Sequence, residues 1–231
     1  DTIINQGILG NKTFGGQAGI INGDSGHGND TITQNDDMEE GSEINGDDGD
    51  DVITVNGGDG ANLIEGDLFD GVSNLQQEAS IRGGGGDDLI TINAILDGDV
   101  DAGTGNDTVI FLQNHREGSV QLGDGDDHIM YKNAADFEGD VESGPYVGNE
   151  NDGSVDGGAG TNAMTLRTDY DAAHTIEVAS DLTDPVLDGI IDGTDILNIH
   201  SLAIEAVDPN SLTGFNAQFF EVDLRAFDAT L

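Results

Sequence analysis

The stretch Gly83-Gly84-Gly85-Gly86-Asp87-Asp88-Leu89-Ile90-Thr91 joins a glycine-rich turn to an alternating apolar segment. Glycine adopts positive φ angles at little steric cost, so consecutive glycines allow a tight turn whose backbone carbonyls point inward. The carboxylate of Asp88 adds a further oxygen to these carbonyls. Such a turn has the donor chemistry of a Ca²⁺ site, because this hard cation takes about six to eight oxygen ligands.

Related turns recur along the whole chain. Apart from Asn62, their closing acids or amides are separated by about 19 to 21 residues or by nearly twice that. Weak candidates for turns in the two wide gaps are Asp70 and the turn after Val141-Glu142-Ser143-Gly144. A single coil of ~19 residues would then explain the series. The closing positions are Asp30, Asp51, Asn62, Asp88, Asp107, Asp127 and Asn162.

Short strands flank each turn. Ser80-Ile81-Arg82 precedes the quoted turn, and after it Ile90 and Ile92 alternate with Thr91, which places them on opposite faces. Short strands repeated at this spacing predict an all-β fold, a parallel β-solenoid whose coils each bury two small apolar rows. We expect it to be right-handed, as parallel crossovers generally are. The predicted parts are an N-terminal strand or cap over 1–16, the repeats over 17–168, and degenerate coils with a C-terminal β cap over 169–231.

The quoted stretch resembles the nonapeptide G-G-x-G-x-D-x-U-x, with U a large aliphatic residue, of the RTX (repeats-in-toxin, hemolysin-type) calcium-binding proteins. Gly83 to Thr91 matches it at every fixed position, and approximate copies cover about 145 residues. The resemblance implies a β-roll that binds several Ca²⁺ ions between successive turns. Departures are Asp47 at the second glycine and amides at two closing positions, where binding should be weaker. The implied ligands are Asp30, Asp51, Asp70, Asp88, Asp107, Asp127, Asn62, Asn162, Gly49, Gly86, Gly105, Gly125, Asp48 and Asp124.

The composition is strongly acidic. The 231 residues include 47 Asp and Glu but only 6 Lys and Arg, for a net charge of −41, and there is no cysteine. Carboxylates on adjacent coils would lie ~4.8 Å apart, where they repel by roughly 3.5 kcal/mol per pair at an effective dielectric of ~20. We therefore expect bound cations to hold the ladder together at neutral pH. The charge disfavours nucleic acid and anionic membranes as partners, and no apolar run is long enough for a membrane span.

These features favour a secreted structural module of an extracellular surface layer, filament or adhesin. We expect it to fold and stiffen on calcium binding after bacterial-type export, because extracellular calcium is high enough to saturate weak sites. Self-assembly into a homo-oligomer or an end-to-end filament or lattice is expected as well. The alternative is an accessory RTX module that assists secretion or folding of an attached enzyme or toxin. We expect no enzyme: a polysaccharide-active β-helix needs clustered basic groups, which are dispersed here at Arg82, Arg116, Arg167 and Lys132.

Overall fold

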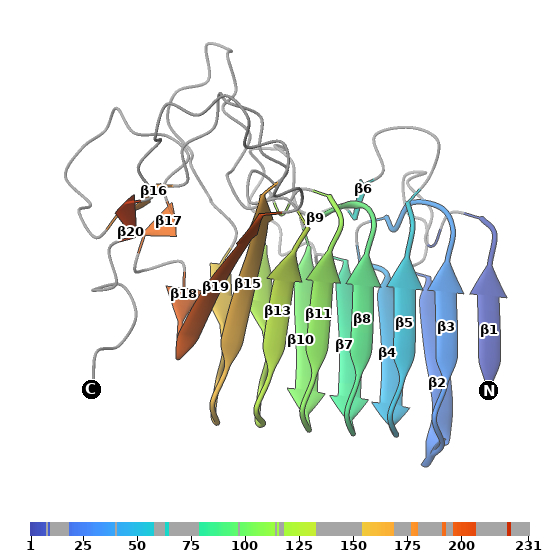
Figure 1. Cartoon of the computed structure of the whole chain (residues 1–231). Helices are drawn as coiled ribbons and strands as arrows, with labels where there is room; N and C mark the ends of the chain where they lie inside the picture. The colour runs from blue at the N-terminus through green and yellow to red at the C-terminus, as the bar shows by residue number, and fades with distance from the viewer. Residues whose placement is uncertain are drawn as a thin grey trace, which may run out of the picture.

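The fold is all-β over the residues that the structure describes, where no helix is found. The computed structural model shows strands arranged side by side in long rows (Figure 1). The described residues are 1–7, 9, 19–39, 41–57, 63–64, 79–96, 98–113, 115, 118–132, 154–168, 177–179, 191–192, 196–206 and 221–222.

Two parallel sheets contain most of the strands. The eight-stranded sheet has the order β1-β3-β5-β8-β11-β13-β15-β19, and the seven-stranded sheet has the order β18-β14-β12-β10-β7-β4-β2. The first comprises β1 (Thr2–Asn5), β3 (Thr31–Gln34), β5 (Val52–Val55), β8 (Leu89–Ile92), β11 (Thr108–Phe111), β13 (His128–Tyr131), β15 (Ala163–Thr168) and β19 (Ser201–Ala206). The second comprises β2 (Ile20–His27), β4 (Glu43–Asp48), β7 (Ser80–Gly85), β10 (Asp99–Thr104), β12 (Ser119–Gln121), β14 (Ser154–Asp156) and β18 (Ile196–Leu197).

Two smaller sheets complete the described strands. One has three strands in the order β17-β16-β20, and the other pairs β6 with β9. Their bounds are β17 (Ile191–Asp192), β16 (Glu177–Ala179), β20 (Glu221–Val222), β6 (Leu63–Ile64) and β9 (Ile95–Leu96).

Glycine-rich turns connect the two large sheets. Each strand of the seven-stranded sheet from β2 to β14 leads through such a turn into the next strand of the eight-stranded sheet, and we call each unit of two strands and their turn a rung. Neighbouring rungs pair in parallel register, so that Ile90 lies beside Ile53 on one side and Val109 on the other. Equivalent residues of the repeats therefore form columns that run along the stack.

The hydrophobic core lies between the two large sheets. Alternate residues of each strand are buried, including Ile44, Ile81 and Val100 from one sheet and Ile53 and Ile90 from the other, all exposed by 1% or less. Complete burial of such a side chain contributes about 1.5–3 kcal/mol. Period-two alternation thus builds a thin core from two facing rows.

The prediction of a parallel β-solenoid is wrong. The two large sheets are stacked on each other (Figure 1), and the described strands form four separate sheets instead of one continuous coiled surface. The reason lies in the connections that return from the eight-stranded to the seven-stranded sheet between β1 and β14, which range from 93–98 to 56–79. In the described residues of these connections, only the two-residue strands β6 and β9 and two isolated bridges, Leu9 to Met38 and Leu96 to His115, pair. Connections so unequal do not build the regular third side of a coil.

The predicted constant coil of ~19 residues is wrong as well. β5 pairs directly with β8 and β4 with β7, so the rung of Asp51 is adjacent to that of Asp88 although 37 residues separate them. β13 likewise pairs directly with β15 and β12 with β14. Long connections are tolerated because the entropy of loop closure grows only slowly with length. The rungs of Asp51 and Asp88 are therefore adjacent, and Asp70, the predicted intermediate turn, lies outside the described residues.

A buried aromatic stack links β11 and β13 to the connection that follows β11. The ring centroids of Phe111 and Tyr131 lie 4.8 Å apart, and those of Phe111 and His115 lie 5.1 Å apart. Nε2 of His115 is 3.4 Å from the carbonyl oxygen of Gly118, which can only accept, so Nε2 carries the proton. Nδ1 then accepts the hydroxyl proton of Tyr131 at 2.9 Å. Burial lowers the pKa of His115 to about 4, which keeps the ring neutral.

Replacing Tyr131 with Phe is expected to lower the free energy of unfolding by about 1–3 kcal/mol, because a buried ring nitrogen loses its hydroxyl donor. Urea unfolding measures the change. In a His115→Leu background the same replacement should have a much smaller effect, since the acceptor is already gone. Equal losses in both backgrounds would show that the hydrogen bond contributes nothing.

Candidate calcium-binding ladder

The residue before each of the strands β3, β5, β8, β11, β13 and β15 belongs to a buried column, which we call the inner ladder. It contains five of the carboxylates and one of the amides that the turn spacing singled out. Their exposure is 3% or less, so these polar groups lie inside the protein. The members are Asp30, Asp51, Asp88, Asp107, Asp127 and Asn162.

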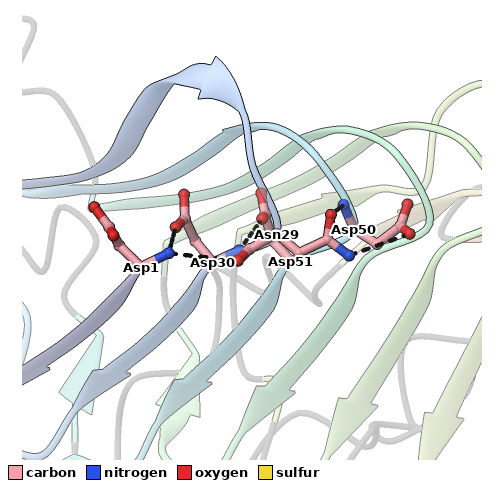
Figure 2. Close-up of polar contacts among 5 residues, drawn as sticks. All are labelled: Asp1, Asn29, Asp30, Asp50 and Asp51. Atoms are coloured by element: carbon pink, nitrogen blue, oxygen red, sulfur yellow. Dashed lines mark hydrogen bonds and ion pairs between the residues drawn. The ribbon is translucent and has the colours of Figure 1, made fainter.

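Backbone hydrogen bonds connect the inner ladder from rung to rung. Oδ1 of Asp51 accepts the backbone N–H of Asp30 at 2.7 Å, and Oδ1 of Asp88 accepts that of Asp51 at 2.7 Å. The same bond recurs at Asp107, Asp127 and Asn162, each at 2.9 Å. Figure 2 shows the start of this series, where the amino group of Asp1 contacts Oδ1 of Asp30. One oxygen of each ladder carboxylate is therefore used to hold the turns in register.

The second carboxylate oxygen is buried without a hydrogen-bond partner at four rungs of the described part of the chain. These atoms are Oδ2 of Asp51, Asp88, Asp107 and Asp127. A buried acceptor without a donor is unfavourable by about 1–3 kcal/mol, and more when it is charged. The ladder therefore contains a row of negative oxygens that protein groups leave uncompensated.

Glycines on the neighbouring sheet make room for these oxygens. A Cβ atom placed on Gly83 would lie 2.4 Å from Oδ2 of Asp88 and 2.3 Å from the carbonyl oxygen of Ala102 on the next rung. One placed on Gly46 would lie 2.3 Å from Oδ2 of Asp51 and 2.4 Å from the carbonyl oxygen of Gly83. All four distances are too short for a Cβ atom, so only glycine fits at these two positions. A carboxylate oxygen and a carbonyl oxygen thus face the same small volume.

At Asn162, the equivalent volume is occupied by a hydrogen-bond donor. Its Nδ2 donates to the carbonyl oxygen of Gly157 at 2.6 Å and to that of Asn198 on the next rung at 3.2 Å. Gly157 stands at the position of Gly83 and Gly46, and its Cβ would likewise meet the ladder side chain and the next carbonyl. The amide thus puts donors where the aspartates put acceptors. An aspartate rung needs a positive charge at this place.

Burial and mutual repulsion raise the pKa of the ladder carboxyls. Burial is the largest cause at Asp88, whose pKa rises to about 7 despite the hydrogen bond from the N–H of Asp51; the charges of Asp107, Asp51 and Asp50 add to the rise. Burial likewise raises the pKa of Asp107 to about 7, assisted mainly by the charge of Asp127. The pKa values of Asp51 and Asp127 are raised for the same first reason. The metal-free ladder thus holds protons more tightly than ordinary aspartates do.

A second column on the solvent side, the outer ladder, differs in both exposure and bonding. Oδ1 of Asn29 accepts the N–H of Asp50 at 3.2 Å (Figure 2), and Oδ1 of Asp50 accepts that of Asp87 at 3.0 Å. In the outer ladder each rung donates to the side chain of the preceding rung, whereas in the inner ladder each rung donates to that of the following one. The members are exposed and already bonded, so they offer no uncompensated buried oxygen: Asn29, Asp50, Asp87, Asn106, Asp126 and Thr161.

The predicted glycine ligands line the outer part of the turns. Gly86 and Gly105 have φ angles of 131° and 129°, and a Cβ on either would lie within 2.2 Å of a carbonyl oxygen of the preceding rung. Their N–H groups donate to carbonyls of the following rung at 2.8 and 2.9 Å. Gly49 and Gly125 occupy the same column and make equivalent bonds.

The other predicted ligands do not join the inner ladder. Asp48 and Asp124 are exposed at the tips of their turns, and Oδ2 of Asp48 lies 2.8 Å from Nδ1 of His27. Asp47, which stands at the second glycine position, adopts a φ of 72° and accepts a hydrogen bond from Nδ2 of Asn45 at 2.9 Å. Asn62 and Asp70 lie outside the described residues.

Two ladder positions were missed from the sequence. Asp1 stands before β1 as Asp30 stands before β3, since Thr2 pairs with Thr31. His200 stands before β19, and its Nδ1 accepts the N–H of Asn162 at 3.2 Å. The first could have been found, because Asp1-Thr2-Ile3 repeats Asp30-Thr31-Ile32. The second lacks both the acid and the usual glycines, so strand pairing alone identifies it.

The donor set of the inner ladder fits a hard cation. It offers only oxygens, namely the uncompensated Oδ2 atoms and the carbonyls beside them, and Ca²⁺ prefers such ligands. No group of three or more acidic, histidine or cysteine side chains converges within the described residues. A cation here would therefore take one or two carboxylates and complete its shell with backbone carbonyls.

Comparisons with known proteins provide no further guide: the chain matches no protein-family model, no curated protein and no solved structure. Within the described residues, no helix has the length and apolar composition needed to span a membrane. The candidate function therefore rests on the chemistry of the inner ladder.

Proposed function

We propose that the chain is a calcium-binding structural module of the RTX type, which acts outside the cell as part of a surface layer, filament or adhesin and not as an enzyme. The observation that carries this proposal is that buried carboxylate oxygens of the inner ladder face carbonyl oxygens, with two acceptors and no donor at the same place. Oδ2 of Asp88 faces the carbonyl of Ala102, whereas Asn162 fills the equivalent place with a donor. Ca²⁺ supplies the missing positive charge and accepts both kinds of oxygen.

The residues that would hold the ions are the ladder aspartates from Asp30 to Asp127. Asp51 would act with the carbonyl of Gly83, and Asp88 with that of Ala102, so each ion would join two rungs. Bound calcium then replaces repulsion between neighbouring carboxylates by shared coordination. Because binding favours only the folded state, an ion at 100 times its dissociation constant adds about 2.7 kcal/mol of stability.

Calcium-dependent folding suits a protein that works after export. In the low calcium of the cytosol the ladder would stay uncompensated, and outside the cell even weak sites would fill. Among the described strands, β1 and β19 end the eight-stranded sheet. Edge strands present unpaired backbone groups that another chain can extend. We propose end-to-end contacts at these edges as the route to a filament or lattice.

Replacing Asp88 with Ala tests the proposal. We expect a loss of affinity at more than one ion, because neighbouring sites share carboxylates and couple. Calorimetric titration of calcium into chelator-treated protein measures stoichiometry and affinity. The matched control is Asp87→Ala in the exposed outer ladder, which should bind as the wild type does. Unchanged calcium binding in Asp88→Ala would refute the assignment.

A further inference from the structure

In the eight-stranded sheet, the outward positions that all eight strands share carry no carboxylate, although about one residue in five of the chain is acidic. Each strand contributes two such positions, which alternate with the core positions. Strand pairing aligns them in two columns across all eight strands. Beyond these columns, the longer strands β15 and β19 pair Arg167 with Glu205. The two columns, which we call the carboxylate-free face, consist of Thr2, Ile4, Thr31, Thr33, Val52, Thr54, Leu89, Thr91, Thr108, Ile110, His128, Met130, Ala163, Thr165, Ser201 and Ala203, of which Thr165 is buried.

Strand propensity does not explain the absence of acids. The outward face of the seven-stranded sheet is built from strands of the same kind and at the same spacing, yet it carries Glu43, Asp99, Asp101 and Asp156, together with Arg82. Acidic residues thus stand in the shared columns of one outer face and are absent from the shared columns of the other. The difference points to a requirement specific to the eight-stranded sheet.

Apolar side chains are exposed on the carboxylate-free face. Ile4 is exposed by 59%, Val52 by 38% and Leu89 by 36%, and they are three of the five large hydrophobic residues most exposed in the described part of the chain. Ile110 and Met130 are half-buried in the column of Ile4, whereas Val52 and Leu89 belong to the other column. Threonine methyl groups fill much of the space between them, so the face is a flat mixture of methyl and hydroxyl groups.

We infer that this face packs against the same face of a second copy of the chain. Two copies with a net charge of −41 repel one another, and like charges brought together across an interface are unfavourable by several kcal/mol. Contact through the carboxylate-free faces is the arrangement that keeps acidic turns apart. Eight strands at ~4.8 Å and four residues at ~3.3 Å give about 500 Å² per copy, or about 1,000 Å² in total, which is the lower limit for a specific interface.

Such a dimer does not use the calcium ligands, so it is tested on folded protein both with chelator and with saturating calcium. Sedimentation velocity over a concentration series, on protein whose strand content is confirmed by circular dichroism, should show a monomer–dimer equilibrium. Added NaCl should strengthen the dimer, because it screens repulsion between the acidic copies. A folded wild-type protein that stays monomeric at all concentrations and salt levels would overturn the inference, whether or not calcium binds.

Thr91→Glu places a charge at the centre of the face and should raise the dimer dissociation constant about tenfold or more. Ile4→Glu, at the most exposed large hydrophobic residue of the face, should act in the same direction and serves where Thr91→Glu fails to fold by circular dichroism. The matched control is Gln121→Glu, which adds the same charge to the exposed face of the seven-stranded sheet and should leave the equilibrium unchanged. Dimers as strong in the face variants as in the control would contradict the inference.

Discussion

Replacing Asp51 and Asp88 with asparagine is expected to stabilise the calcium-free protein by about 1–3 kcal/mol per site. The asparagine Oδ1 can keep the bond to the preceding N–H, while Nδ2 replaces a buried oxygen that has no partner. The new donor faces the carbonyls of Gly83 and Ala102, as Nδ2 of Asn162 faces those of Gly157 and Asn198. Urea unfolding in the presence of chelator measures the gain.

The same two variants should bind calcium more weakly, because an amide oxygen carries no charge. Stability without calcium and affinity for calcium are thus expected to change in opposite directions. Neighbouring residues supply matched controls: Asp50→Asn and Asp87→Asn in the outer ladder should change neither quantity much, since these side chains are exposed and bonded. Conversely, Asn162→Asp should destabilise the calcium-free protein by about 1–3 kcal/mol. A loss of stability in Asp51→Asn and Asp88→Asn would show that these carboxylate oxygens do not face carbonyl oxygens without a donor, contrary to our account.

The calcium-free protein should become less stable as the pH rises from about 4 through 7. Asp88 and Asp107 have pKa values of about 7 in the folded protein, raised from 3.8 mainly by burial. Over this range the folded state therefore binds more protons than the unfolded state, and the free energy of unfolding falls with increasing pH. The stabilisation is complete below about pH 4 and is lost above about pH 7, the reverse of ordinary acid denaturation.

Urea unfolding across this pH range, with chelator present, measures the slope. In the Asp88→Asn variant the free energy of unfolding should depend less steeply on pH, because one of the carboxyls with a raised pKa is gone. The Asp87→Asn variant should keep the slope of the wild type. With saturating calcium the dependence should reverse, since protons and cations compete for the same oxygens. Stability that increases from pH 4 to 7 in the calcium-free wild type would contradict these assignments.

The spacing of the turns predicted much of the inner ladder. Asp30, Asp51, Asp88, Asp107, Asp127 and Asn162 were identified from the sequence and stand on consecutive rungs. The signal is strong because steric contacts enforce it: a Cβ at Gly86 or Gly105 would meet the carbonyl of the rung before it. Close packing of one turn against the next requires glycine, so the packed turns can be recognised from the recurring glycines in the sequence.

The connections between rungs could not be predicted in this way. A regular coil suggested an extra rung at Asp70, but β5 pairs directly with β8. The register of the rungs depends on contacts between paired strands. The long connection 56–79 adds little loop-closure free energy, so the repeat pattern of the sequence does not reveal how long a connection is. The prediction of a parallel β-solenoid was wrong for the same reason, since unequal connections do not form a regular third side. The donor role of Asn162 was also hidden, because an amide in the sequence does not show which carbonyls it meets.

A crystal structure grown in millimolar calcium, with anomalous difference maps for calcium, tests the central claim most directly. We expect peaks about 2.3–2.6 Å from Oδ2 of Asp51 and Asp88 that also contact the carbonyl oxygens of Gly83 and Ala102. Such peaks should be absent beside Asn162, where Nδ2 already donates to both carbonyls. A map without calcium along the inner ladder, from crystals of the same folded protein, would contradict the claim that this column is the calcium site.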